Sequence, residues 1–117
     1  MFDLSTDLVE TKWSKLQKEI QASFDKKIDI NAALFLIGIQ ELGKGFKTFT
    51  KEQKQDLMHI ANCRILSASD YYELKGIDDE GWPHWENKNP LPVLTLEEQD
   101  LFLKHHIVLY FSDIYDL

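Results

Sequence analysis

The sequence predicts an all-α fold, a compact bundle of four main helices in a single domain over residues 1–117. Apolar residues recur at intervals of three and four along four stretches of the chain. Three of these stretches open with a residue suited to capping a helix. A chain of 117 residues with 44% hydrophobic residues is also long enough to bury one core. The helices are expected at residues 5–24, 29–42, 50–72 and 95–113, with an ordered, aromatic-rich loop at residues 73–94.

The first expected helix begins at Ser5, whose hydroxyl suits the N-cap position. One apolar stripe then follows the helical repeat, and the opposite face carries Lys, Glu and Gln side chains. The stripe consists of Val9, Trp13, Leu16, Ile20 and Phe24. This helix is therefore expected to lie with one side on a core and the other in water.

The second expected helix is apolar in every direction around its axis, and Gly43 follows it as a C-terminal stop signal. A helix that is apolar all round is normally central. Gly38 lowers the helix propensity of this segment. We therefore expect a close crossing with another helix at Gly38.

The third and fourth expected helices each begin with a capping box. Thr50 pairs with Gln53 in the third helix, and Thr95 pairs with Glu98 in the fourth. The third helix has one apolar face, made of Leu57, Ala61, Ile65, Ala68 and Tyr72. The fourth has two apolar stripes, one more than a small bundle requires. The second stripe is expected to be covered by the long loop or by another copy of the chain in a homodimer.

The expected loop contains all three prolines of the chain, which exclude a continuous helix. Its most distinctive feature is Trp82, His84 and Trp85, preceded by an acidic run at residues 78–80. The two indoles could form a wall of a ligand pocket and stack on a flat or cationic group. Alternatively, they plug one end of the bundle while the acidic run is solvated.

His59 and Cys63 lie one turn apart on the third expected helix, on the side opposite its apolar face. Such a pair could bind a metal, with a further histidine completing the site. His59 could instead lower the pKa of Cys63 and activate its thiol. No second paired motif supports either chemistry, so a surface role is favoured, and no metal and no cofactor are expected.

Glu41 lies near the C-terminal end of the apolar second helix, where the helix dipole disfavours a negative charge. A carboxylate there requires a partner if it is buried. Arg64 on the third helix is the expected partner, and Lys44 and Lys47 are alternatives. The pair is interpreted either as a structural ion pair or as part of a pocket.

The net charge of −7 comes entirely from the second half of the chain. The only local run of basic residues, between Lys44 and Lys54, is interrupted by Glu52. Nucleic acid is therefore not an expected partner. Cys63 is the only cysteine, which excludes an internal disulfide and fits a reducing compartment. No signal-peptide pattern and no apolar stretch of about 20 residues are present, so a cytoplasmic location without membrane contact is expected.

Residues 35–43, 49–59 and 81–84 resemble segments of a group of short bacterial proteins with no assigned function. The resemblance spans residues 30–112 of the chain. It implies a bacterial cytoplasmic protein that stands on its own. It implies no activity, cofactor or catalytic residue.

From the residues themselves we expect a small binding or protein-interaction module rather than an enzyme. Its binding surface would be the Trp82–Trp85 loop and the acidic C-terminal half. Glu41 and Arg64 are further candidate binding residues. The expected partner is an unknown small molecule or protein. The alternative is a small metal- or thiol-dependent enzyme built on His59, Cys63 and Glu41.

Overall fold

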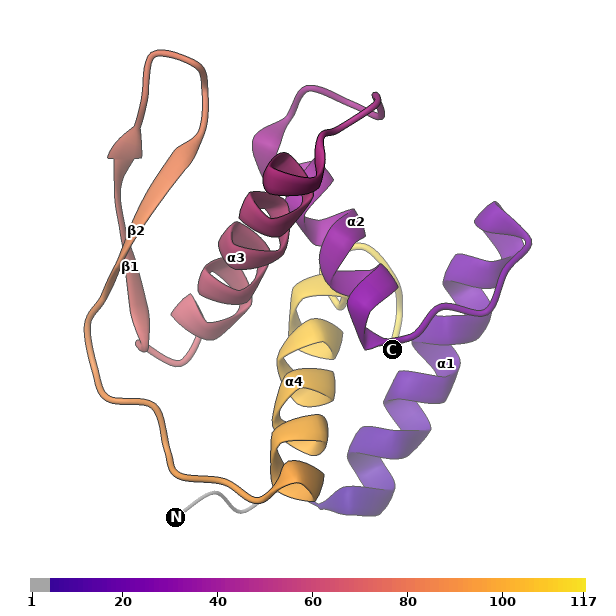
Figure 1. The fold of residues 1–117 in the computed structure, drawn as a ribbon. Helices are drawn as coiled ribbons and strands as arrows, with labels where there is room; N and C mark the ends of the chain where they lie inside the picture. Colours follow the sequence, from indigo (N-terminus) through magenta and orange to yellow (C-terminus); the bar gives the residue numbers. More distant parts are fainter. Residues whose placement is uncertain (1–4) are drawn as a thin grey trace. The chain divides into compact units, whose positions relative to one another are not determined.

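A computed structural model describes residues 5–117 and contains four helices and one antiparallel β-hairpin (Figure 1). In chain order the elements are α1 (Thr6–Phe24), α2 (Ile30–Leu42), α3 (Lys51–Ser67), β1 (Tyr72–Ile77), β2 (Pro83–Asn87) and α4 (Leu96–Phe111). The expected all-α class is wrong, because part of the segment predicted as a loop forms a two-stranded sheet. The four predicted helices are present.

The chain falls into two compact units. Unit 1 combines the residues up to Ile30 with Pro92–Leu117, and unit 2 comprises Asn31–Leu91. The single domain over residues 1–117 stays a prediction. None of the helices in residues 5–117 is both long and apolar enough to cross a membrane.

In unit 1, α1 and α4 pack along each other with their N-terminal ends together (Figure 1). The Ser5 hydroxyl caps α1, and four of the five residues of the predicted stripe are buried: Val9, Trp13, Leu16 and Ile20. The ammonium of Lys104 on α4 lies 2.9 Å from a carboxylate oxygen of Glu10 on α1 and 2.9 Å from one of Asp100. This cation therefore joins the two helices.

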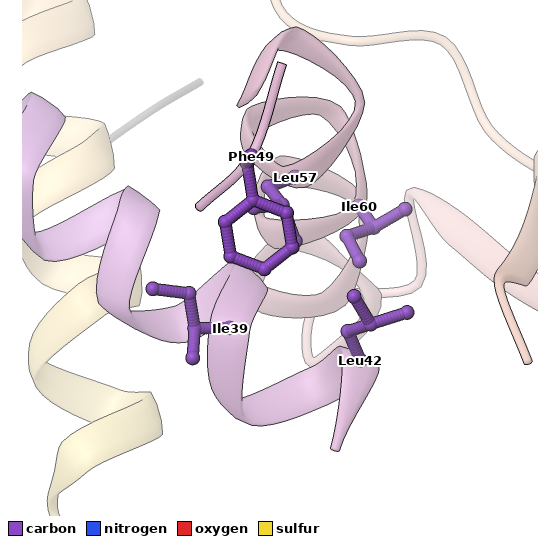
Figure 2. Close-up of a cluster of buried hydrophobic side chains, with 5 residues drawn as sticks. All are labelled: Ile39, Leu42, Phe49, Leu57 and Ile60. Carbon is purple, nitrogen blue, oxygen red and sulfur yellow. The ribbon is translucent and has the colours of Figure 1, made fainter. Parts of the chain in front are cut away.

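In unit 2, α2 and α3 meet around a cluster of buried apolar side chains (Figure 2). The cluster comprises Ile39, Leu42, Phe49, Leu57 and Ile60, and Phe35, Trp82 and Trp85 pack against it. The α2–α3 connection therefore supplies one core side chain, and the hairpin supplies two indoles.

The third helix begins at the predicted capping box of Thr50 and Gln53, but it ends at Ser67 rather than near residue 72. Asp70 adopts a left-handed conformation (φ 64°), and the N–H of Tyr71 donates to the carbonyl of Leu66. This hydrogen bond is the one that closes a Schellman motif, which usually has glycine at the left-handed position. The helix stops there, and the chain turns into β1.

The β-hairpin pairs Tyr72 with Asn87, Leu74 with Trp85 and Ile77 with Pro83, with a bulge between Leu74 and Gly76. Proline is tolerated at the first position of a strand, where Pro83 lies, because no ladder hydrogen bond requires its missing N–H. A two-stranded hairpin is marginal by itself in water. Here it packs on α3 through both strands (Figure 1).

The turn between the strands has the geometry of a type I turn followed by a glycine bulge. The N–H of Gly81 donates to the carbonyl of Asp78 (3.0 Å), and the N–H of Asp78 donates to the carbonyl of Trp82 (2.9 Å). Gly81 has a φ of 87°, in a region that L side chains rarely adopt. The turn therefore depends on a glycine at this position.

Candidate functional site

A groove of about 330 Å³ lies between α3 and the tip of the hairpin. Its volume is at the lower end of the range of about 300–1,000 Å³ that is usual for ligand pockets. We call it the hairpin groove. It is lined by Gln53, Asp56, His59 and Ile60 of α3 and by Asp78, Glu80, Trp82, Pro83 and His84 of the hairpin. All of these residues belong to unit 2.

The Asp78 carboxylate organises the hairpin side of the groove. One oxygen accepts hydrogen bonds from the backbone N–H groups of Glu80 and Trp82, both at 2.9 Å, and the other lies 2.9 Å from Nε2 of His84. The contact with His84, followed by the hydrogen bond from Trp82, holds the pKa of Asp78 below its usual value. The acidic run is thus not simply solvated, since Asp78 ties the turn to His84.

A lysine of the α2–α3 connection supports the same turn. The ammonium of Lys44 donates a hydrogen bond to the carbonyl of Glu80. A Cβ placed on Gly81 would lie 3.2 Å from Cε of Lys44, so this side chain packs directly against the turn. Lys44 is not among the residues that line the groove.

The two indoles have different positions. Trp82 lines the groove and also packs against the apolar cluster, a position compatible with a pocket wall and with a core plug. Trp85 packs against the cluster without lining the groove. Its indole Nε1 is buried and has no hydrogen-bond acceptor in the part of the chain that the structure describes.

His59 and Cys63 are neighbours, with His59 Nε2 3.6 Å from the sulfur of Cys63. His59 is exposed and lines the groove, but Cys63 is fully buried. Burial raises the pKa of the Cys63 thiol to about 11. Within residues 5–117, no group of three or more His, Cys, Asp and Glu side chains is arranged to hold a metal ion.

Glu41 and Arg64 form the predicted ion pair, with Nε of Arg64 3.2 Å from Oε1 of Glu41. The side chains are 24% and 40% exposed respectively, so the pair is only partly withdrawn from water. Neither residue lines the hairpin groove. The geometry agrees with a structural ion pair.

A second hollow, of about 510 Å³, lies in unit 1 between the N-terminal ends of α1 and α4. It is lined by Thr6, Glu10, Leu96, Glu97, Glu98, Asp100 and Leu101. Several of its polar groups have structural partners: Glu10 and Asp100 pair with Lys104, and Glu98 completes the capping box of α4. Among residues 5–117, no histidine or aromatic side chain lines this hollow, and the hairpin groove is the stronger candidate.

The structure therefore brings together three of the residues singled out in the sequence, Trp82, His84 and His59. Sequence reasoning missed Asp56 and Ile60, which join the groove only because this face of α3 meets the hairpin. It also missed the role of Asp78. A signal for that role was present, because aspartate at the first position and glycine at the fourth are typical of a type I turn.

The sequence matches no protein-family model, and no match was found among curated proteins or solved structures. The resemblance to short bacterial proteins, the bacterial source and the cytoplasmic location stay predictions. What the fold and the groove define is a small mixed α/β protein with a concave surface between a helix and a β-hairpin.

Proposed function

We propose that this protein is a small binding module and that the hairpin groove is its binding site. The observation that supports the proposal most strongly is that two separate elements, α3 and the hairpin, both contribute apolar and polar side chains to one concave surface. Ligand sites are typically concave, with an apolar lining and a few polar groups that orient the ligand.

The supports of the groove favour a preformed site. Trp82 is anchored on the apolar cluster, and the turn is held by Asp78 from within and by Lys44 from the α2–α3 connection. A ligand that binds such a surface does not have to order the turn or the Trp82 indole. The entropic cost of binding is lower for that reason.

The thiol-enzyme alternative has less support. The nucleophile in cysteine chemistry is the thiolate, and catalytic cysteines usually have a lowered pKa and an accessible sulfur. Cys63 has a raised pKa and a buried sulfur. In the proposed binding module, His59 is a residue of the groove rather than a base that activates Cys63.

The homodimer predicted from α4 remains a separate proposal. The hairpin groove requires no second copy of the chain, because all of its lining residues come from Asn31–Leu91.

The test is a ligand screen monitored by NMR on uniformly ¹⁵N-labelled protein, with a diverse fragment library and a set of short peptides. We expect saturable shifts of the Trp82 indole signal and of the His59 and His84 backbone signals. Trp82→Leu should abolish binding of those ligands. Glu86→Gln, a change on β2 outside the groove, should preserve it. Ligands that shift only signals far from the groove, or a screen without any ligand, would contradict the proposal.

A further inference from the structure

Apart from His59 and His84, the ionisable side chains that line the hairpin groove are acidic. Of the described residues 5–117, three carboxylates line it, from Asp56, Asp78 and Glu80, and no lysine or arginine does. A concave surface with charges of one sign concentrates ions of the opposite sign. A cationic ligand is therefore favoured over an anionic one.

Two of the three carboxylates are available to a ligand. The oxygens of Asp78 are already used by the turn and by His84. The side-chain carboxylates of Asp56 and Glu80 make no hydrogen bond or ion pair with any of residues 5–117, and both residues are exposed. Asp56 belongs to α3 and Glu80 to the turn, so they approach the groove from two different elements.

The remaining lining suits a flat, delocalised cation. Ile60, Trp82 and Pro83 give the groove an apolar wall. An indole attracts a cation placed over its ring. A guanidinium is planar, is more weakly hydrated than an ammonium, and has donors on several edges that match carboxylate oxygens. A guanidinium therefore has a flat face that suits the apolar wall and donors at its edges that suit carboxylates.

The turn itself accepts a cation elsewhere in this structure. The ammonium of Lys44 donates to the carbonyl of Glu80, outside the groove lining. A cation inside the groove would meet the side chain of Glu80 instead of its backbone.

We infer that the hairpin groove binds the guanidinium of an arginine residue in an exposed segment of a partner protein. The inference rests on the proposed function and names its ligand class. A peptide-borne arginine is favoured over free arginine, because the apolar wall can also contact the flanking peptide, whereas free arginine has there only an α-ammonium and an α-carboxylate, whose charges cancel.

The experiment compares three probes on ¹⁵N-labelled protein: acetyl-Gly-Arg-Gly-amide, the same peptide with citrulline in place of arginine, and free arginine. Citrulline retains the shape of arginine but is neutral. We expect the arginine peptide to give saturable shifts at the Trp82 indole and at the Asp56 and Glu80 amides. The citrulline peptide should bind at least about tenfold more weakly, because its charge-assisted hydrogen bonds are lost. Free arginine should also bind more weakly than the arginine peptide, because it lacks the flanking peptide that contacts the apolar wall.

Three variants locate the site. Asp56→Asn and Glu80→Gln should each lower the affinity for the arginine peptide by about fivefold or more, since each variant removes one charged acceptor. Asp79→Asn is the matched control, because Asp79 is an exposed acid of the same turn that does not line the groove. It should change the affinity less than about twofold, as expected for a screened rim charge. Circular dichroism of the variants verifies that they fold.

Equal binding of the arginine and citrulline peptides would overturn the inference, as would equal losses from Asp56→Asn and Asp79→Asn. If free arginine bound more tightly than the arginine peptide, the groove would be a site for a small molecule, and the inference of a partner protein would be wrong. If neutral or anionic ligands from the screen occupy the groove while the arginine peptide does not, the proposed function survives and only this inference fails. If neither the screen nor the peptide finds the groove, both fail.

Discussion

Gly38 of α2 lies directly against the backbone of Leu57 on α3: a Cβ at position 38 would be 2.5 Å from the Leu57 carbonyl oxygen. The close helix crossing predicted from this glycine is confirmed. Leu57 belongs to the apolar cluster on which Trp82 packs. The contact therefore helps to place α3, and with it one side of the hairpin groove.

Gly38→Ala should destabilise the protein even though alanine is the better helix former. Helix propensity favours alanine by about 1 kcal/mol. The added methyl, however, would collide with backbone atoms, which cannot rotate away, and overpacking of this kind costs about 1–3 kcal/mol or more. We expect a net loss of about 1–2 kcal/mol in the free energy of unfolding, measured by urea denaturation.

Gly76→Ala is the matched control, because nothing lies within 4 Å of a Cβ at that position. The free energy of unfolding should change by less than about 0.5 kcal/mol, as for ordinary surface substitutions. A stabilised Gly38→Ala variant would show that the two helices are farther apart than the structure has them.

Local chemistry explains which parts of the fold could be predicted. The capping boxes at Thr50 and Thr95 involve residues three positions apart, so the sequence alone locates the starts of α3 and α4. The end of α3 was missed because Asp70, rather than glycine, takes the left-handed position. The hairpin was missed because the stability of a strand depends on its partner strand and on packing against α3, which a single segment does not reveal.

The same distinction applies to the site. Trp82 and His84 stood out by composition, but Asp56 and Ile60 became groove residues only through the packing of α3 on the hairpin. Helical spacing correctly made His59 and Cys63 neighbours. It did not reveal that Cys63 is buried while His59 is exposed, because burial depends on what covers that side of the helix.

The ion pair between Glu41 and Arg64 should contribute little stability. Both side chains are partly exposed, and pairs in contact with water are typically worth about 0.2–1 kcal/mol. A double-mutant cycle with Glu41→Gln and Arg64→Met should give a coupling energy in this range, and it should decrease in 1 M salt. A coupling above about 2 kcal/mol that does not respond to salt would show a desolvated pair instead.

The Cys63 thiol should be unreactive in the folded protein. Because its pKa is raised from 9.0 to about 11, the folded state retains a proton that the unfolded state releases between these values. The associated stability is complete below pH 9 and is lost as the pH rises towards 11. Alkylation by iodoacetamide at pH 8 should be slow and should accelerate on unfolding.

Cys63→Ala is the control for the loss of stability at alkaline pH. Its free energy of unfolding should fall less than that of the unmodified protein between pH 9 and 11. Rapid alkylation of folded protein at pH 8 would contradict the burial of the sulfur and would renew the case for thiol chemistry.

His106 of α4 should make stability depend on pH on the acid side. Its ring is buried, which lowers its pKa below 6.5, although the contact between its Nδ1 and the carbonyl of Phe102 at 2.8 Å opposes the shift. Neighbouring His105 also has a lowered pKa, through burial and through the charge of Lys12 on α1. The unfolded state therefore binds more protons than the folded state just below pH 6.5. The stability that the neutral rings contribute is complete above that value and is lost as the pH falls.

The variant His106→Leu should flatten the dependence of the free energy of unfolding on pH between about 6.5 and 5, where an unperturbed histidine begins to titrate. His105→Gln should flatten it too, by removing a second titrating ring and its repulsion of His106. If the free energy of unfolding of His106→Leu depended on pH as steeply as that of the unmodified protein, the His106 ring would be protonated equally easily in the folded and unfolded states. That result would contradict the burial of the ring.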